Sequence, residues 1–289
     1  MYDSILLPYD GSEGADRALE HASDIAQWAD ATLRTIYVAD TTIESVTVVE
    51  TEVVDALEEH GRTILEDAKA VLEGEAIDHR TDVVQGNPAP TIVEYAETYD
   101  HDLIVMPTHG RTGISRYLLG SITEKVVRLA SVPVLTTRLA QDERLAFPYE
   151  DILIPTDGSE GAMRAARHGL ELGGMLDATA HVLSVVETST LGIDVLSETD
   201  DRESEQGATE AIESVTSTAA DYGVESIVST VERGEPADVI IEYVETNDID
   251  AVVMGTTGRR GTERILLGSV AEKTVPSAPV PVLTVGQPR

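Results

Sequence analysis

Residues 254–269 read Met-Gly-Thr-Thr-Gly-Arg-Arg-Gly-Thr-Glu-Arg-Ile-Leu-Leu-Gly-Ser, and residues 106–121 read Met-Pro-Thr-His-Gly-Arg-Thr-Gly-Ile-Ser-Arg-Tyr-Leu-Leu-Gly-Ser. The stretch at 254–269 starts 148 residues after its near-copy at 106–121. Each follows a short apolar run and precedes a segment with helical spacing. A glycine-rich loop between a strand and a helix start is a common binding site for phosphate. The sequence therefore predicts two anion sites, one in each copy of a duplicated domain.

The duplication covers almost the whole chain. Residues 5–14, Ile-Leu-Leu-Pro-Tyr-Asp-Gly-Ser-Glu-Gly, return as Ile-Leu-Ile-Pro-Thr-Asp-Gly-Ser-Glu-Gly at residues 152–161. A period of this length indicates two whole domains and not a solenoid of short repeats. We expect a first domain over residues 1–138, a polar linker over residues 139–150 and a second domain over residues 151–289.

The composition restricts the partners and the compartment. The net charge is −33, from 53 acidic and 20 basic residues, so we expect neither nucleic acid nor an anionic membrane as a partner. Our preferred explanation is adaptation to high salt, where screening over ~3 Å at 1 M makes the self-repulsion tolerable. An ordinary acidic protein is the alternative. Without cysteine, a long apolar run or a recognisable signal segment, the chain is expected in the cytoplasm.

The hydrophobic pattern of the first half alternates between strands and helices, and the second half repeats the order. This pattern predicts an α/β fold with an open, doubly wound parallel sheet in each half. Basic residues gather beside the glycine loops. The predicted strands are Ser4–Pro8, Thr32–Val38, Ala76–Val84, Leu103–Met106 and Val132–Thr136, and the predicted helices are Ser12–Trp28, Glu50–Leu72, Pro88–Glu97 and Ser121–Leu129.

Ligands of such sheets bind beyond the carboxyl ends of the strands, where the strand order reverses. Asp10 and Asp157 follow the first strand of each half, and the glycine loops follow the fourth strand. If the first and fourth strands are neighbours, the aspartate and the loop face each other across one crevice. The aspartate can then accept hydrogen bonds from ribose hydroxyls or from an adenine amino group.

These motifs resemble those of a tandem universal stress protein of the nucleotide-binding branch. The family motif is Gly, two residues, Gly, nine residues, then Gly-Ser or Gly-Thr. The second half matches it completely, at Gly255, Gly258, Gly268 and Ser269. The first half has Pro107 in place of the first glycine and matches at Gly110, Gly120 and Ser121. The fold implied is a pair of adenine-nucleotide alpha-hydrolase-like domains, each with five parallel strands in the order 3-2-1-4-5.

The resemblance also implies a ligand, which is ATP or a related adenine nucleotide such as AMP or ADP. Mg²⁺ or Mn²⁺ held by the phosphates is the implied accompanying ion. The implied adenosine contacts are Pro8, Tyr9, Asp10, Val38 and Met106 in the first half, and Pro155, Thr156, Asp157, Val185 and Met254 in the second. The implied phosphate contacts are Gly110, Gly120, Ser121 and Ile122, and Gly255, Gly258, Gly268, Ser269 and Val270.

The residue types suit this task, but each also has a purely structural explanation. Gly110 and Gly258 are expected to have positive φ and to let a phosphate approach the backbone. The Gly-Ser pairs are expected to present free N–H groups and a hydroxyl at a helix start. As an alternative, residues 121–124 and 269–272 read as capping boxes with serine as the N-cap. Asp10 and Asp157 could equally be N-caps, although Ser12 and Ser159 compete for that position.

Efficient catalysis is not expected. The loops lack the Gly-Lys-Ser/Thr of a P-loop, and no general base or pair of carboxylates with metal-ligand spacing accompanies them. His109, His101 and His181 are expected to be solvated and not catalytic. The main hypothesis is a nucleotide-binding regulatory or stress-response protein. A slow ATPase or phosphoryl-transfer enzyme and a nucleotide-free dimerisation module are the alternatives. By the resemblance, residues 133–137 and 281–285 join the halves into an internal pseudo-dimer, and two chains can associate further as a homodimer.

Overall fold

A computed structural model describes residues 1–41, 50–75, 77–110, 118–138, 143–188, 198–258 and 267–287, with backbone alone at 50–56 and 198–201. The chain divides into two compact units, one over Met1–Gln141 and one over Asp142–Gln287. Within the described ranges, no helix combines the length and the apolar character that a membrane span requires.

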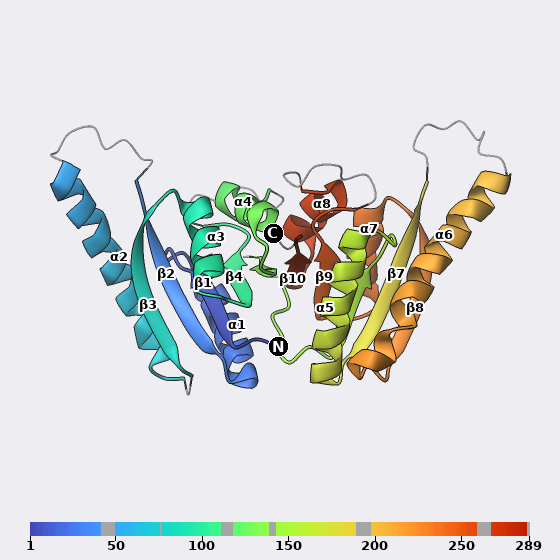
Figure 1. The fold of residues 1–289 in the computed structure, drawn as a ribbon, viewed down its shortest axis with the longest axis horizontal. Helices are drawn as coiled ribbons and strands as arrows, with labels where there is room; N and C mark the ends of the chain where they lie inside the picture. Colours follow the sequence, from blue (N-terminus) through green and yellow to red (C-terminus); the bar gives the residue numbers. More distant parts are fainter. Residues whose placement is uncertain are drawn as a thin grey trace. The chain divides into compact units, whose positions relative to one another are not determined.

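The first unit alternates strand and helix from its first element to its last (Figure 1). Its described strands pair in parallel, in the order β3-β2-β1-β4-β5. The elements are β1 (Ser4–Pro8), α1 (Glu13–Ala29), β2 (Thr32–Asp40), α2 (Glu50–Leu72), β3 (His79–Gly86), α3 (Pro88–Thr98), β4 (Leu103–Pro107), α4 (Ser121–Leu129) and β5 (Val134–Thr137).

The second unit repeats this order, and its described strands pair in parallel as β10-β9-β6-β7-β8. Its elements are β6 (Asp151–Pro155), α5 (Glu160–Leu176), β7 (Thr179–Glu187), α6 (Glu198–Thr216), a short 3-10 helix η1 (Ala219–Tyr222), β8 (Ile227–Gly234), α7 (Pro236–Thr246), β9 (Ala251–Gly255), α8 (Ser269–Ser277) and β10 (Val282–Val285). The predicted α/β class and the 3-2-1-4-5 strand order are confirmed in both units.

Helices cover both faces of each sheet. In the first unit α1 and α2 pack on one face, while α3 and α4 pack against each other on the opposite face (Figure 1). The central strands are therefore apolar on both sides, as parallel sheets require. Ile5, Leu6 and Leu7 of β1 have no exposed surface, and every residue of β4 is buried. The short apolar runs in the sequence are the centres of the two sheets.

Most element boundaries agree with the sequence pattern to within three residues. β3 starts at His79, later than the predicted Ala76, which itself lies outside the described residues. β5 starts at Val134 and not at Val132, because Pro133 between them has no N–H to donate to a ladder. Proline in the first turn begins α3 and α7, as expected.

Serine, not aspartate, caps the first helix of each unit. The Ser12 hydroxyl accepts the N–H of Ala15 at 3.2 Å, and the Ser159 hydroxyl accepts the N–H of Ala162 at 3.2 Å. These bonds satisfy an amide that the helix itself leaves unpaired. The aspartates two residues earlier are therefore not needed as caps.

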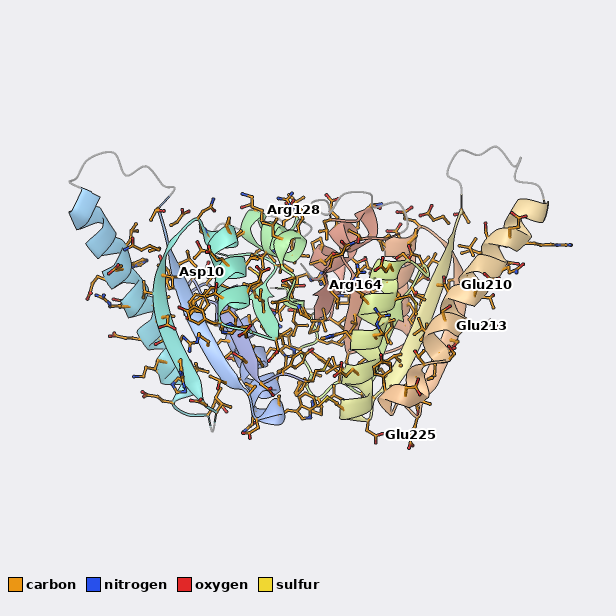
Figure 2. The ribbon with its side chains drawn as sticks, viewed as in Figure 1. Asp10, Arg128, Arg164, Glu210, Glu213 and Glu225 are labelled. Atoms are coloured by element: carbon orange, nitrogen blue, oxygen red, sulfur yellow. The ribbon has the colours of Figure 1, made fainter. Side chains whose placement is uncertain are left out.

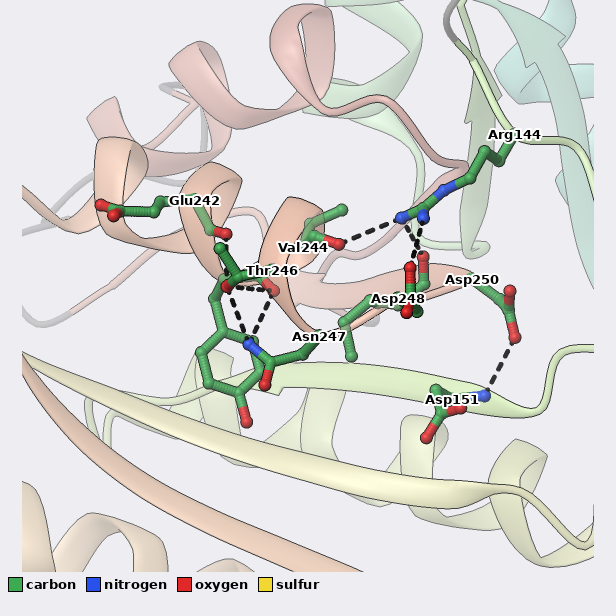
Figure 3. A network of polar contacts seen from close by, with 10 residues as sticks. Arg144, Asp151, Glu242, Val244, Thr246, Asn247, Asp248 and Asp250 are labelled. Atoms are coloured by element: carbon green, nitrogen blue, oxygen red, sulfur yellow. Dashed lines mark hydrogen bonds and ion pairs between the residues drawn. The ribbon is translucent and has the colours of Figure 1, made fainter.

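Part of the predicted linker is bound to the second unit through Arg144 (Figure 3). The backbone N–H of Arg144 donates to the Pro279 carbonyl at 2.8 Å. Its guanidinium donates to the carbonyl oxygens of Val244 at 3.0 Å and Ile249 at 2.9 Å, and pairs with the Asp248 carboxylate at 3.3 Å. Val244 lies in the last turn of α7, where carbonyls lack intrahelical partners. Arg144 therefore anchors the segment that leads into β6.

The two units differ in the polar residue at the third position of their second strand, which is Arg34 in β2 and His181 in β7. In the first unit, Arg34 of β2 donates to the Asp82 carboxylate at 2.6 Å and to the Tyr95 hydroxyl at 3.0 Å. Tyr95 also donates to Asp82 at 2.8 Å, and burial together with this carboxylate raises the pKa of Tyr95 to about 12. The phenol therefore stays protonated and keeps donating.

In the second unit, His181 of β7 takes the place of the arginine. Its Nε2 lies 2.9 Å from Asp151 Oδ1, and its Nδ1 lies 3.0 Å from the Tyr243 hydroxyl. His181 is buried, and so is His101 in the first unit. The prediction that these two histidines are solvated is wrong. His181 lies near the amino end of β7 and packs against Tyr243 of α7, whereas His101 precedes β4 and packs against Tyr95 of α3.

Candidate functional site

The first and fourth strands of each unit are neighbours. In the first unit Ile5 pairs with Leu103, and Leu6 pairs with Ile104. In the second unit β6 and β9 pair in the same parallel way. The segments that follow these strands therefore emerge at one edge of the sheet, at the place where the strand order reverses. The condition for the predicted crevice is met twice.

In the first unit the aspartate and the glycine loop are in direct contact. A Cβ placed on Gly110 would lie 2.6 Å from Asp10 Oδ2. The other carboxylate oxygen, Oδ1, accepts the backbone N–H of Ser12 at 3.0 Å. Figure 2 labels Asp10, which lies beyond the carboxyl end of β1. The carboxylate is thus held between the turn that starts α1 and the loop that follows β4.

The second unit reproduces this contact with its own residues. A Cβ on Gly258 would lie 2.8 Å from Asp157 Oδ2, and Oδ1 accepts the N–H of Ser159 at 2.9 Å. The structure therefore brings together, in both units, the two parts of the site that lie about 100 residues apart in sequence.

The reason for glycine at these positions differs from the prediction. Gly110 and Gly258 do not have positive φ, in contrast to Gly11 and Gly158, where φ is 74° and 76°. The predicted left-handed conformation is therefore wrong. The requirement is steric, because any side chain at either position would meet the aspartate carboxylate.

The last glycines of the motif, Gly120 and Gly268, are already engaged through their backbone. Gly120 N–H donates to the Thr108 carbonyl at 2.8 Å, and Gly268 N–H donates to the Thr256 carbonyl at 2.7 Å. The expectation that these N–H groups are free is wrong. Each bond closes the loop onto its own strand end, and a Cβ on Gly120 would lie 2.9 Å from the same Thr108 oxygen.

Glycine, and not serine, is the N-cap of the helix that follows. Gly120 and Gly268 have extended backbone and no side chain that could accept an amide, so α4 begins at Ser121 and α8 at Ser269. The carbonyl of Gly120 accepts the first helical bond, from Glu124 N–H at 2.8 Å. The capping-box explanation is therefore wrong, since it requires serine as the cap. The first-turn amides receive nothing from their cap residue, which suits an anion at this helix end.

The remaining phosphate-side residues lie at the same helix starts. Ser121 and Ser269 are exposed, as is Ile122, and Val270 is half-buried. On the adenosine side Pro8 and Pro155 end β1 and β6 and are half-buried. Val38 and Val185 are half-buried near the carboxyl ends of β2 and β7, whereas Met106 and Met254 are buried in β4 and β9 at 4% exposure each. All of these belong to the carboxyl-end edge of the two sheets.

The two candidate sites differ in the residue that precedes the aspartate. Tyr9 is buried, and its hydroxyl donates to Asp16 Oδ1 at 2.5 Å. Burial and the Asp16 carboxylate both raise the pKa of Tyr9, so the phenol remains a donor. In the second unit Thr156 occupies this position, and its hydroxyl accepts Gly158 N–H at 3.2 Å. The sequence showed this substitution but not the partner of Tyr9.

The residue that ends β4 or β9 is a second difference. A Cβ on Gly255 would lie 2.9 Å from the backbone carbon and oxygen of Gly161, so this glycine permits close approach of α5. In the first unit Pro107 fills the position, and its carbonyl accepts the buried Thr123 hydroxyl at 2.9 Å. Gly161 and Thr123 were missed as site-supporting residues, although Gly161 belongs to the repeated Asp-Gly-Ser-Glu-Gly.

The charged part of each loop lies outside the described residues, which stop at Gly110 and Gly258 and resume at 118 and 267. Arg111, Arg116, Arg259, Arg260 and Arg264 belong to that part. Next to it, His109 is half-buried, with Nδ1 3.1 Å from the Thr108 hydroxyl, and burial lowers its pKa. Over the described ranges, no three histidine, aspartate or glutamate side chains are arranged to hold a metal ion.

The fold and the paired aspartate–glycine contacts define the class of protein, a duplicated doubly wound α/β protein with a candidate site at the β1–β4 edge of the first unit and another at the β6–β9 edge of the second. The chain belongs to the universal stress protein family, whose model matches residues 1–138 and 148–286. A universal stress protein of Methanocaldococcus jannaschii is 38% identical over 148 residues, which are 49% of this chain and 84% of the relative.

Other relatives match both units at once. A universal stress protein of Mycolicibacterium smegmatis is 26% identical over 302 residues, covering 97% of this chain and 96% of the relative. The crystal structure of a universal stress protein from Archaeoglobus fulgidus matches with a TM-score of 0.75 and 22% identity, over 98% of each chain. The structural match shows the fold, and both matches show that the tandem arrangement is shared.

Proposed function

We propose that this universal stress protein is a regulatory protein that binds one adenine nucleotide, ATP or its AMP or ADP relatives, in each unit, at the β1–β4 edge of the first and at the β6–β9 edge of the second. The observation that carries the proposal is the aspartate held against the loop glycine, found twice with independent residues. A carboxylate and a glycine-capped helix start then lie at the same edge of the sheet. These are the groups that a nucleoside and a phosphate chain respectively need.

The chemistry of the site assigns a part to each group. The amides of the first turn of α4 or α8 donate to phosphate oxygens, with the helix dipole in support. Ser121 and Ser269 add a hydroxyl at the same point. Asp10 or Asp157 accepts hydrogen bonds from ribose hydroxyls or from an adenine amino group. Mg²⁺ or Mn²⁺ enters with the phosphates, which supply its oxygen ligands.

A second candidate function rests on the packing of the motif glycines. A Cβ built on Gly255, Gly258 or Gly268 would meet another part of the unit at 2.9, 2.8 or 3.2 Å, so the loop would need these glycines even without a ligand. The alternative is therefore a purely architectural, nucleotide-free module. Mass spectrometry of small molecules released from the purified protein separates the two candidates. A nucleotide supports binding, and its absence together with no heat in calorimetric titrations with ATP, ADP, AMP and cyclic AMP supports the architectural module.

Variants test whether the binding uses the proposed site. Asp157→Ala is expected to weaken ATP binding at the second site about tenfold, the loss of roughly one strong hydrogen bond. Asp248→Ala is the matched control, because this carboxylate is exposed and precedes β9 at the opposite edge of the sheet. Equal effects of the two substitutions would remove the aspartate from the site.

Slow hydrolysis of ATP is the remaining alternative. It predicts ADP formation that falls in a protein carrying both Ser269→Ala and Asp157→Ala, with the remaining activity coming from the first unit, whereas a regulatory protein retains bound ATP. We also propose that residues 133–137 and 281–285 join the two units, and that chains associate as a homodimer in the cytoplasm. Sedimentation velocity at several protein concentrations tests the homodimer.

A further inference from the structure

A Cβ built on Gly110 or on Gly258 would meet one described residue beyond its chain neighbours. Of the atoms that the structure describes, those within 4 Å of a Cβ built on Gly110 are Oδ2 and Cγ of Asp10, at 2.6 and 3.6 Å. For Gly258 they are Oδ2 and Cγ of Asp157, at 2.8 and 3.8 Å. Both glycines are exposed. An added methyl group at either position would therefore collide with the carboxylate and with no other described group.

The carboxylate cannot retreat without loss. Oδ1 of Asp157 accepts Ser159 N–H at 2.9 Å, and Oδ1 of Asp10 accepts Ser12 N–H at 3.0 Å. Because the two oxygens of a carboxylate move together, a displacement of Oδ2 by the several tenths of an ångström that a methyl group requires also strains this hydrogen bond. The turn thus holds one oxygen, and the glycine leaves the space that the other oxygen occupies.

Backbone conformation gives no competing reason for glycine here, since neither residue has positive φ. Other glycines of the loop behave differently. A Cβ on Gly268 would meet the Thr256 carbonyl at 3.2 Å, and one on Gly255 would meet the backbone of Gly161. Those glycines accommodate the main chain, whereas Gly110 and Gly258 accommodate a side chain.

We propose that Gly258 and Gly110 are positioning residues for Asp157 and Asp10, so that the central glycine of the motif acts on the nucleoside side of the site through the carboxylate. This inference rests on the proposed nucleotide binding and adds a role to it. The loop glycine and the aspartate then form one functional unit, although they follow different strands.

A double-mutant cycle measured by calorimetric titration with ATP tests the proposal. Gly258→Ala and Asp157→Ala are each expected to weaken binding at the second site about tenfold. The double variant is expected to bind as weakly as Asp157→Ala alone, because the added methyl group no longer meets a carboxylate. Additive losses, about a hundredfold together, would overturn the proposal and leave nucleotide binding intact.

A matched control and an independent repeat accompany the cycle. Gly268→Ala is expected to combine additively with Asp157→Ala, since its added methyl group meets the main chain. Gly110→Ala and Asp10→Ala repeat the cycle in the first unit. Thermal melts identify variants that fail to fold, and Asp157→Gly with Gly258→Ala gives a second version of the double variant. If the unaltered protein binds no nucleotide, the proposed function itself is overturned, an outcome distinct from additive losses.

Discussion

The ring of Tyr37 on β2 lies directly against Gly61 in the middle of α2, in space that a Cβ on Gly61 would overlap. In the second unit the equivalent positions hold Ser184 and Ala208. A glycine inside a helix costs roughly 1 kcal/mol relative to alanine. The first unit therefore combines a large ring with no side chain on the helix, and the second combines a small residue on each element.

Gly61→Ala is accordingly expected to destabilise the first unit by about 1–3 kcal/mol despite its better helix propensity, because the methyl group displaces the Tyr37 ring. In a protein that already carries Tyr37→Ser, Gly61→Ala is expected to cost much less stability, because the ring that the methyl group would displace is gone. Urea unfolding of the single and double variants measures both effects. Higher stability of Gly61→Ala would show that the ring moves aside without strain.

Arg144→Met is expected to destabilise the second unit by about 2 kcal/mol, since methionine keeps the stem but removes the donors to Val244 and Ile249. Asp248→Asn is the control and is expected to cost under about 0.5 kcal/mol, because the Asp248 carboxylate is 94% exposed. Denaturant midpoints of the two variants provide the comparison. A similar cost for both would assign the stabilisation to the ion pair and not to the carbonyl contacts.

Gly255→Pro is expected to weaken ATP binding at the second site about tenfold in calorimetric titration. The proline Cβ would lie 2.9 Å from the Gly161 backbone and would push α5 away from the loop. Pro107→Gly in the first unit is the reciprocal variant and keeps the buried Thr123 hydrogen bond to the carbonyl. Unchanged affinity in Gly255→Pro would show that this position does not influence the site.

Acidification is expected to weaken folding through His21, which is buried in α1. Burial lowers its pKa from 6.5 to about 4, so between these values the unfolded chain binds more protons than the folded chain. The stabilisation from keeping His21 neutral is therefore complete above pH 6.5 and is lost as the pH falls toward 4. Between pH 7 and pH 5 this residue is expected to lower the free energy of unfolding by about 2 kcal/mol.

Urea unfolding of His21→Leu at pH 7 and pH 5 checks this dependence. The variant is expected to lose about 2 kcal/mol less than the unaltered protein over that interval. His60→Gln, the replacement of an exposed histidine, serves as the control. Identical pH dependence in His21→Leu and the unaltered protein would contradict the assignment.

Salt is expected to stabilise this protein. Exposed glutamates stand one helical turn apart on α6, at Glu210 and Glu213, and Glu225 lies beyond that helix (Figure 2). With a net charge of −33 such pairs repel at low ionic strength, and screening relieves the repulsion. Denaturant midpoints should rise from low to molar NaCl, and more weakly in a Glu210→Gln, Glu213→Gln variant. A flat response would remove the hypothesis of salt adaptation.

The fold could be predicted almost completely because its signals are local and repeated. Apolar runs such as Leu103–Pro107 mark central strands, and proline at 88 and 236 marks helix starts. The sequence did not decide whether aspartate or serine caps α1 and α5, since aspartate and serine two residues apart are both good caps. The anchoring of Arg144 could not be predicted, because its acceptors are backbone carbonyls about 100 residues away that carry no sequence signature.

The site was predictable in its location and less so in its detail. The aspartate and the loop met as expected, because parallel strands bring their carboxyl ends to one edge. The predicted reason for Gly110 and Gly258 was wrong, because a glycine in a sequence does not reveal whether it is needed for positive φ or for the space beside it. The capping box failed for a related reason. Ser-x-x-Glu describes a cap only when serine precedes the helix, and glycine takes that position here.

The arginine network of the first unit and the histidine network of the second make the two repeats non-interchangeable. If unequal recombination within the gene copied the β2 segment of the first repeat over β7, Arg34 would replace His181 opposite Thr230, which stands where the first unit has Asp82. Its charge would then lack a carboxylate on the third strand of the unit and would meet Asp151 on β6, the partner of His181, instead. Copying one repeat over the other would thus dismantle a polar network that each unit builds from different strands, and this cost opposes homogenisation of the two halves during evolution.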